Sequence, residues 1–153
     1  MINEELIKVL FASMTPIGEL RLSIPLGILV MELPVLSVFF ISVLGNSIPV
    51  IILVPIIQKV ANFAESLPRP ISSVFRWRVE KLSRTNAKLF NKYGYLALFT
   101  LVAIPLPFTG AWTGCLASWV FGIPSKKSIP TIIAGIITAG IIVTTLVVVG
   151  SNL

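Results

Sequence analysis

The chain has 153 residues, of which 56% are hydrophobic and 12% are charged, and its mean hydropathy is +0.98. In soluble domains about a quarter of the residues are charged, so the composition predicts an all-α integral membrane protein with one small domain spanning 1–153. Histidine and aspartate are absent and Cys115 is the single cysteine. These absences exclude an intrachain disulfide, thiolate metal clusters and most catalytic constellations. We therefore expect neither an enzyme nor a cofactor or bound metal.

The first 33 residues predict a helical hairpin. A break at 15–18, which contains Pro16 and Gly18, separates an amphipathic helix from a second apolar piece at 19–31. The apolar piece carries Glu19 and Arg21 directly after the break. We interpret 2–33 as a re-entrant hairpin that enters the membrane from the outer face and returns to it.

Residues 35–57 are uncharged and predict the first transmembrane helix, because about 20 apolar residues suffice to cross a bilayer. Its middle is interrupted by small and polar residues, namely Gly45, Asn46, Ser47 and Pro49. Two interpretations stay open for them. The span unwinds at this point, or Asn46 and Ser47 hydrogen-bond a neighbouring helix.

Residues 59–92 carry eight basic and two acidic residues, a net charge of +6 that equals the formal net charge of the whole chain. Short basic loops stay in the cytoplasm, so this segment is predicted to be cytoplasmic. Apolar residues among the basic ones favour a helix on the membrane surface, against anionic headgroups. Nucleic-acid binding is the weaker interpretation, and we expect none.

Residues 93–123 form an uncharged stretch that is too long for one span and is broken in its middle by Pro105, Pro107, Gly110 and Gly114. Two half-helices of about 11 residues would each reach half-way through the bilayer. Unwound backbone at that depth must be buried in protein or line a cavity. We interpret the stretch as a second re-entrant hairpin, which keeps Lys126 and Lys127 on the cytoplasmic side with 59–92.

A break at 124–127 precedes the second transmembrane helix, which is predicted at 129–150. The two halves of the chain share their spacing. Gly45 lies 11 residues after Pro34, and Gly135 lies 11 residues after Pro124. Because one hairpin enters from each side, the fold class is predicted to be two re-entrant hairpins plus two transmembrane helices in an inverted repeat, a common transporter plan.

Glu19 and Arg21 are the sharpest candidates for chemistry. A charge at the bilayer centre costs roughly 2.5–3.5 kcal/mol on insertion scales, so two of them need a reason. In the functional interpretation, Arg21 holds an anionic headgroup and Glu19 binds a proton or a cation. In the structural interpretation, the pair is a polar plug that closes the hairpin tip. Residues two apart on a helix do not face each other, so each needs its own partner.

Residues 109–114 read Thr-Gly-Ala-Trp-Thr-Gly and open the second half-helix. Free N–H groups at a helix start attract anions, and Thr109, Trp112 and Thr113 add polar groups. The alternative is close helix packing at Gly110 and Gly114.

The stretches ELRLSIP at 19–25 and AIPLPFTGAWTG at 103–114 resemble the hallmark segments of the prokaryotic small multidrug export protein family, which read close to ELRGAIP and PLPGTGAWTG. Leu22, Ser23 and Phe108 depart from that pattern. The family resembles a compact relative of the DedA/VTT membrane proteins, with paired re-entrant hairpins. The resemblance implies that the substrate site is formed by Glu19, Arg21, Pro25, Pro105, Pro107, Thr109, Gly110, Trp112 and Gly114, and Thr113 joins them from the residues alone.

Three functions follow as expectations. The first is a transporter that moves a phospholipid or polyprenyl-phosphate across the cytoplasmic membrane, with proton or sodium coupling. The second is a proton-coupled exporter of lipophilic cations, which the fixed charge of Arg21 disfavours. The third is a structural or assembly protein. A homodimer in contact with membrane lipids is also expected, since so few helices leave the hairpin tips open to lipid.

Overall fold

The computed structural model describes residues 2–64, 80, 90, 92–105 and 109–151. All regular elements in these residues are helical, which confirms the all-α prediction. They are α1 (Ile2–Met14), α2 (Glu19–Pro25), the π-helix η1 (Leu26–Val30), α3 (Val35–Ala64), α5 (Tyr95–Ala103), α6 (Ala111–Val120) and α7 (Ser125–Ser151). Most of the basic segment at 59–92, including the part for which a surface helix is predicted, lies outside the described residues.

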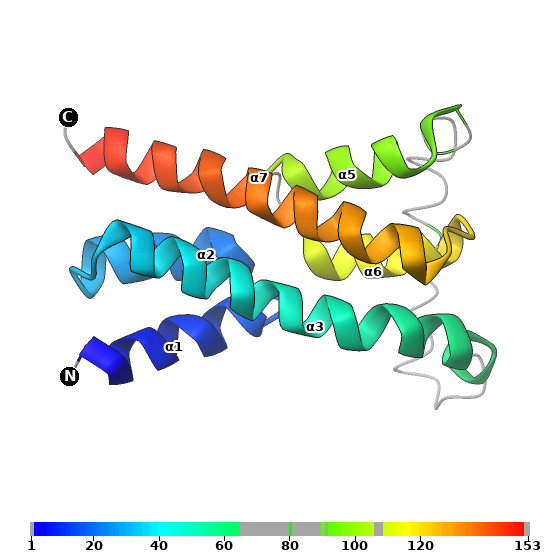
Figure 1. Ribbon diagram of the computed structural model, residues 1–153, viewed down its shortest axis with the longest axis horizontal. Helices are drawn as coiled ribbons and strands as arrows, with labels where there is room; N and C mark the ends of the chain where they lie inside the picture. Colours follow the sequence, from blue (N-terminus) through cyan, green and yellow to red (C-terminus); the bar gives the residue numbers. More distant parts are fainter. Residues whose placement is uncertain (1, 65–79, 81–89, 91, 106–108, 152–153) are drawn as a thin grey trace.

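Two long helices run the length of the molecule in opposite directions, as Figure 1 shows for α3 and α7. Both are long and apolar enough to cross a membrane, over Val35–Ile57 and Ser125–Ser151. The prediction of two long apolar helices is therefore confirmed, with corrected ends. α7 begins four residues earlier than predicted, because the carbonyl of Pro124 accepts the first backbone bonds and Lys126 and Lys127 fit a helical turn. α3 continues past 57 to Ala64.

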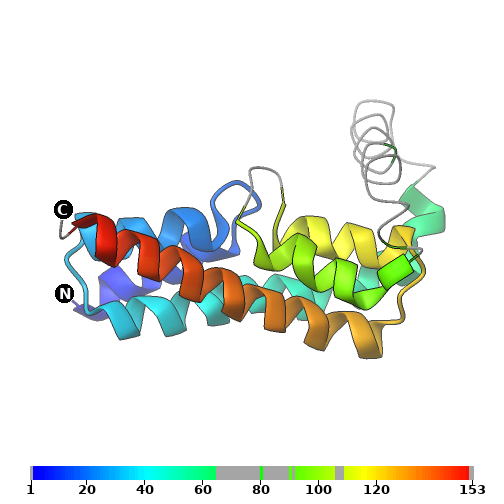
Figure 2. The same cartoon turned by 90° about the horizontal axis from the view of Figure 1, so that it is seen from above.

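The remaining helices form two hairpins whose tips meet near the middle of the molecule (Figure 2). One hairpin consists of α1 followed by α2 and η1, and the other of α5 and α6. Each turn uses unusual backbone. Glu19 has a positive φ of 47°. Gly110 has φ 134°, which glycine adopts readily because it has no Cβ. In η1 the helix widens to π-type bonds such as Met31 N to Leu26 O, directly after Pro25, which has no N–H to donate.

The first long helix does not unwind at its polar centre, so that interpretation of 45–49 is wrong. α3 is continuous from Val35 to Ala64 with Pro49 inside it. In an apolar environment each broken backbone bond costs several kcal/mol, and a proline removes only one. Gly45 serves close packing instead, because a Cβ there would lie 2.7 Å from the carbonyl oxygen of Leu10 in α1.

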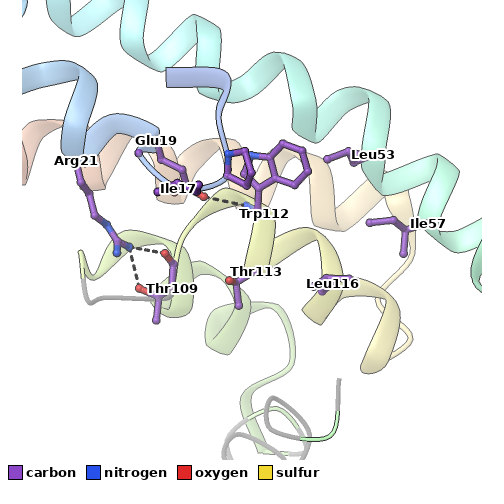
Figure 3. Close-up of a pocket in the computed structure, with 11 residues that line it drawn as sticks. Ile17, Glu19, Arg21, Leu53, Ile57, Thr109, Trp112, Thr113 and Leu116 are labelled. Atoms are coloured by element: carbon purple, nitrogen blue, oxygen red, sulfur yellow. Dashed lines mark hydrogen bonds between the residues drawn. The ribbon is translucent and has the colours of Figure 1, made fainter. Parts of the chain in front are cut away.

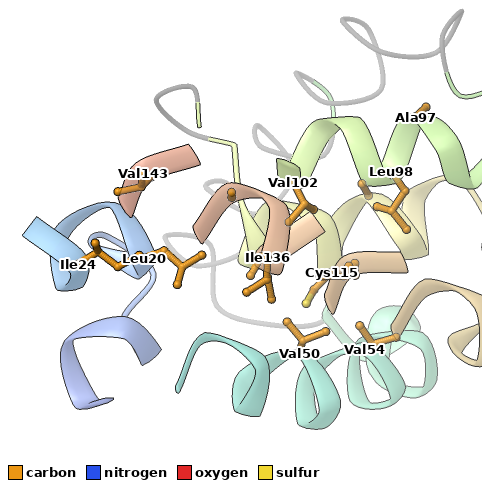
Figure 4. Packing of buried hydrophobic residues seen from close by; sticks show 14 of the residues in the cluster. Leu20, Ile24, Val50, Val54, Ala97, Leu98, Val102, Cys115, Ile136 and Val143 are labelled. Carbon is orange, nitrogen blue, oxygen red and sulfur yellow. The ribbon is translucent and has the colours of Figure 1, made fainter. Parts of the chain in front are cut away.

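Each hairpin also packs across the molecule. α2 contacts α7 as well as α3, and α6 contacts α3 as well as α7. Buried side chains from both halves form one core cluster, which includes Ile24, Leu98 and Ile136 (Figure 4). This crossed packing holds the two tips against each other between the long helices.

Candidate functional site

The carboxylate of Glu19 lies at the N-terminus of α6. Its Oε1 accepts a hydrogen bond from the backbone N–H of Trp112 at 3.2 Å, and its Oε2 accepts one from Ala111 at 3.3 Å. The first N–H groups of a helix have no partner within the helix, and the helix dipole favours a negative charge there. The residue is only 8% exposed. The carboxylate of Glu19, from the first hairpin, therefore occupies the anion-binding position at the N-terminus of α6 in the second hairpin.

The guanidinium of Arg21 makes the second link between the tips. Its Nη2 donates to the carbonyl oxygen of Thr109 at 2.6 Å and to the Thr109 hydroxyl at 2.9 Å (Figure 3). A third link comes from the indole Nε1 of Trp112, which donates to the carbonyl oxygen of Met14 at 3.3 Å. Glu19 and Arg21 thus have different partners, as their spacing on a helix requires.

A pocket of about 570 Å³ opens beside this junction. Its polar wall contains Arg21, Thr109 and Thr113, and its apolar wall contains Leu53 and Ile57 of α3 with Leu116 of α6 (Figure 3). Pro16, Ile17, Gly18, Glu19 and Trp112 complete the lining. A cavity with a few converging polar groups on an apolar wall is typical of a small-molecule or lipid site.

Asn46 joins the junction from α3, as the second interpretation of the span's polar centre predicts, but Ser47 does not follow it, because its hydroxyl donates to the carbonyl oxygen of Val43 in the same helix. The side chain of Asn46 is 1% exposed and lies beside Glu19. Its Oδ1 has no partner. Asn46 and Glu19 line a cavity of about 10 Å³, which is close to the smallest volume that holds one water molecule. The polar junction therefore reaches the middle of the first long helix.

The structure brings six of the ten predicted site residues together at the tips: Glu19, Arg21, Thr109, Gly110, Trp112 and Thr113. Three others lie elsewhere. Pro25 is at the transition from α2 to η1, and Pro105 is in the turn outside the pocket lining. Gly114 packs on Val102, whose Cγ2 would be 2.7 Å from a Cβ at 114, so its contact is helix packing. Pro107 lies outside the described residues.

Sequence reasoning missed the apolar wall of the pocket. Leu53 and Ile57 belong to the first span, where no polar or breaking residue distinguishes them from lipid-facing neighbours. Leu116 in α6 is likewise not distinguished by the sequence from its lipid-facing neighbours. Their spacing of four residues places Leu53 and Ile57 on one helical face, but only the position of α6 shows that this face borders a pocket. Ile17 stood within the recognised break and is 96% exposed at the tip.

A model of the family described as "Putative small multi-drug export protein" matches residues 19–142. The chain belongs to this family. The matched range begins at Glu19, directly after the turn of the first hairpin, and includes α2, α3, the second hairpin and most of α7. Neither the curated proteins nor the solved structures compared with the chain gave a match. Membership of a small multi-drug export family, together with two helices apolar enough to span a bilayer, indicates a membrane transport protein rather than an enzyme.

Proposed function

We propose that the protein translocates a lipid or lipid-phosphate across the cytoplasmic membrane through the pocket between the hairpin tips. The observation that carries the proposal is that Glu19 and Arg21 bind different groups at the junction of the hairpin tips. Both residues line the pocket, but the two carboxylate oxygens of Glu19 accept backbone hydrogen bonds at the N-terminus of α6, while the guanidinium of Arg21 donates to Thr109 in the pocket wall. Because backbone N–H groups pair the carboxylate of Glu19, the group in the lining that suits an anionic ligand is the guanidinium of Arg21, and a guanidinium matches the oxygens of a phosphate well. Leu53, Ile57 and Leu116 offer an apolar wall for the attached chain.

Export of lipophilic cations is the second candidate, because the family description names multi-drug export. A cation would need the carboxylate of Glu19. Both of its oxygens already accept backbone hydrogen bonds, and Arg21 would repel a cation in the same pocket. The geometry thus favours an anionic headgroup. Coupling to protons or sodium stays a prediction, with Glu19 as the titratable group at the junction.

The proposed membrane arrangement is multi-pass, with two re-entrant hairpins related by an inverted repeat. α5 and α6 have nine and ten residues, so each is about 15 Å long or less at 1.5 Å per residue and reaches about half-way through a 30 Å core. Residues with positive φ stand at corresponding ends of the hairpins, Glu32 and Gly122, which are 90 residues apart.

The two long helices support the same repeat. At a shift of 90 residues, 17 of the 20 positions in 31–50 match those in 121–140 in being buried, half-buried or exposed. Gly45 approaches the carbonyl oxygen of Leu10 in α1, and Gly135 approaches that of Phe99 in α5. A shared glycine contact on the preceding hairpin is what two copies of one unit would make.

Topology gives one test. Single cysteines replacing Lys81 and Lys127, in a Cys115→Ser background, are expected to react with an impermeant maleimide from the same face of the membrane. The reason is that a re-entrant second hairpin returns the chain to the side from which it came. Reaction from opposite faces would show that residues 93–123 cross the bilayer.

Function is tested with purified protein in liposomes. A fluorescent lipid with a phosphate headgroup should change leaflets severalfold faster than in protein-free liposomes, because the pocket shields the headgroup from the apolar core. A cationic dye loaded into the same vesicles should not move. Dye movement without lipid movement would favour cation export, and movement of neither would favour the structural interpretation. Crosslinking in the same vesicles tests the proposed homodimer.

A further inference from the structure

The pocket extends from the hairpin tips toward one end of the molecule only. Beyond the tip residues, its lining continues along Leu53 and Ile57 in the second half of α3 and along Thr113 and Leu116 of α6. The second half of α3 and the whole of α6 run from the middle of the molecule to the end at which α5 and α7 begin (Figure 1).

That end carries positive charge. Lys59 near the end of α3, Lys92 before α5, and Lys126 and Lys127 in the first turn of α7 are all exposed. Lys127 Nζ lies 5.7 Å from the ring centroid of Tyr95, which places the starts of α7 and α5 side by side. At the opposite end, three glutamates outnumber one lysine among the charged residues described there, namely Glu4, Glu5, Glu32 and Lys8.

The other side of the tips is filled. Leu20 and Ile24 of α2 pack there with Val143 of α7, which is 7% exposed (Figure 4). Val143 stands 90 residues after Leu53 and is therefore its counterpart in the proposed repeat. Leu53 is half-buried and lines the pocket, whereas Val143 belongs to the core. The two halves thus share their arrangement of helices, but a pocket opens at Leu53 and none of the pocket lining is at Val143.

We infer that the pocket is loaded from the cytoplasmic leaflet, by a lipid with an anionic phosphate headgroup. The inference rests on the proposed function and on the basic end facing the cytoplasm. Lysines at a membrane surface attract anionic lipids by about 1 kcal/mol each, so they concentrate such headgroups at the mouth of the pocket. Arg21 receives the phosphate at the inner limit of the pocket, and the packed α2–α7 contact blocks passage to the outer leaflet in this state.

Access is tested with single cysteines replacing Leu53 and Val143 in a Cys115→Ser background. Glu4→Cys and Lys127→Cys serve as matched reporters of the two ends. Right-side-out and inside-out membrane vesicles are treated with an impermeant maleimide. Leu53→Cys should react from the cytoplasmic face, which also labels Lys127→Cys, about tenfold faster than from the other face, as expected if the opposite opening is populated less than a tenth of the time. Val143→Cys should react slowly from both faces.

The chemical class of the ligand that occupies the pocket is tested in the same vesicles. Short-chain phosphatidic acid should slow the labelling of Leu53→Cys severalfold, whereas inorganic phosphate at the same concentration should not. Labelling of Leu53→Cys from the Glu4 face, equally from both faces or from neither would overturn the inference, and so would equal protection by inorganic phosphate. Lipid translocation is measured separately, so sided labelling without translocation would leave the access inference standing and refute the proposed function.

Discussion

Arg21→Ala is expected to reduce lipid translocation in proteoliposomes to the level of protein-free liposomes. The guanidinium is the positive group in the pocket wall and also holds Thr109 by two hydrogen bonds. A hydrogen bond to a charged group contributes about 1.5–3 kcal/mol, which corresponds to roughly a 10- to 100-fold loss of headgroup affinity. Arg21→Lys should retain part of the activity, because it keeps the charge but loses the planar fork.

The control for Arg21 is Lys8→Ala. Lys8 is an exposed basic residue whose Nζ lies 2.9 Å from Glu5 Oε1 on the surface of α1, and such pairs contribute little to stability. This variant should transport like the wild type. Each protein is first checked for a single symmetric peak in size-exclusion chromatography. Folded Arg21→Ala and Arg21→Lys proteins with wild-type transport would mean that the charge pair is a structural plug and that the headgroup binds elsewhere.

Gly110→Ala should cause the largest loss of stability among single substitutions at the tips. Gly110 has φ 134°, and an L-residue in a sparsely populated backbone region costs about 1–3 kcal/mol. The new Cβ would also overlap the carboxylate of Glu19, with Glu19 Cδ only 2.8 Å away. Moving that carboxylate removes the acceptor for the N–H groups of Ala111 and Trp112, and unpaired buried polar groups cost a further 1–3 kcal/mol or so each.

The measurement for Gly110→Ala is the thermal unfolding midpoint in detergent, with Gly150→Ala as the matched control. No atom lies within 4 Å of a Cβ at 150 near the end of α7, and alanine favours a helix over glycine by about 1 kcal/mol, so the control should melt at or slightly above the wild-type temperature. In the double variant Glu19→Ala, Gly110→Ala the overlap disappears, so the two losses should be less than additive. Additive losses, or a wild-type midpoint for Gly110→Ala, would show that the tips do not meet as described.

Much of the architecture was predictable because the bilayer imposes strong length rules. An uncharged run of 35–57 is long enough for a span, and Pro105 and Gly110 mark the break between α5 and α6, although Gly114 lies inside α6. The break at 15–18 followed from the same local rules. Local signals were weaker at helix ends, so the early start of α7 and the extension of α3 to Ala64 were missed.

The sequence predicted only part of the chemistry at the junction of the hairpin tips. Charges in an apolar segment marked Glu19 and Arg21, because burying them is costly. Both residues line the pocket, and the sequence could not show that backbone N–H groups bind the carboxylate of Glu19 there. That depends on the N-terminus of α6, which lies about 90 residues away along the chain and binds the carboxylate. The sequence left two interpretations of Asn46 open, and the unbroken α3 together with the position of Asn46 beside Glu19 decided between them.

The sequence by itself determined the membrane class, the helical content, the two long apolar helices and the polar residues at the tips. Each of these depends on composition or on neighbours within a few turns of helix. Only the tertiary structure decided that the tips meet, that Glu19 caps α6, and that Leu53, Ile57 and Leu116 line a pocket on the basic half. The physical reason is that an apolar side chain facing lipid and one facing a cavity have the same local chemistry, and only the packing of distant helices distinguishes them.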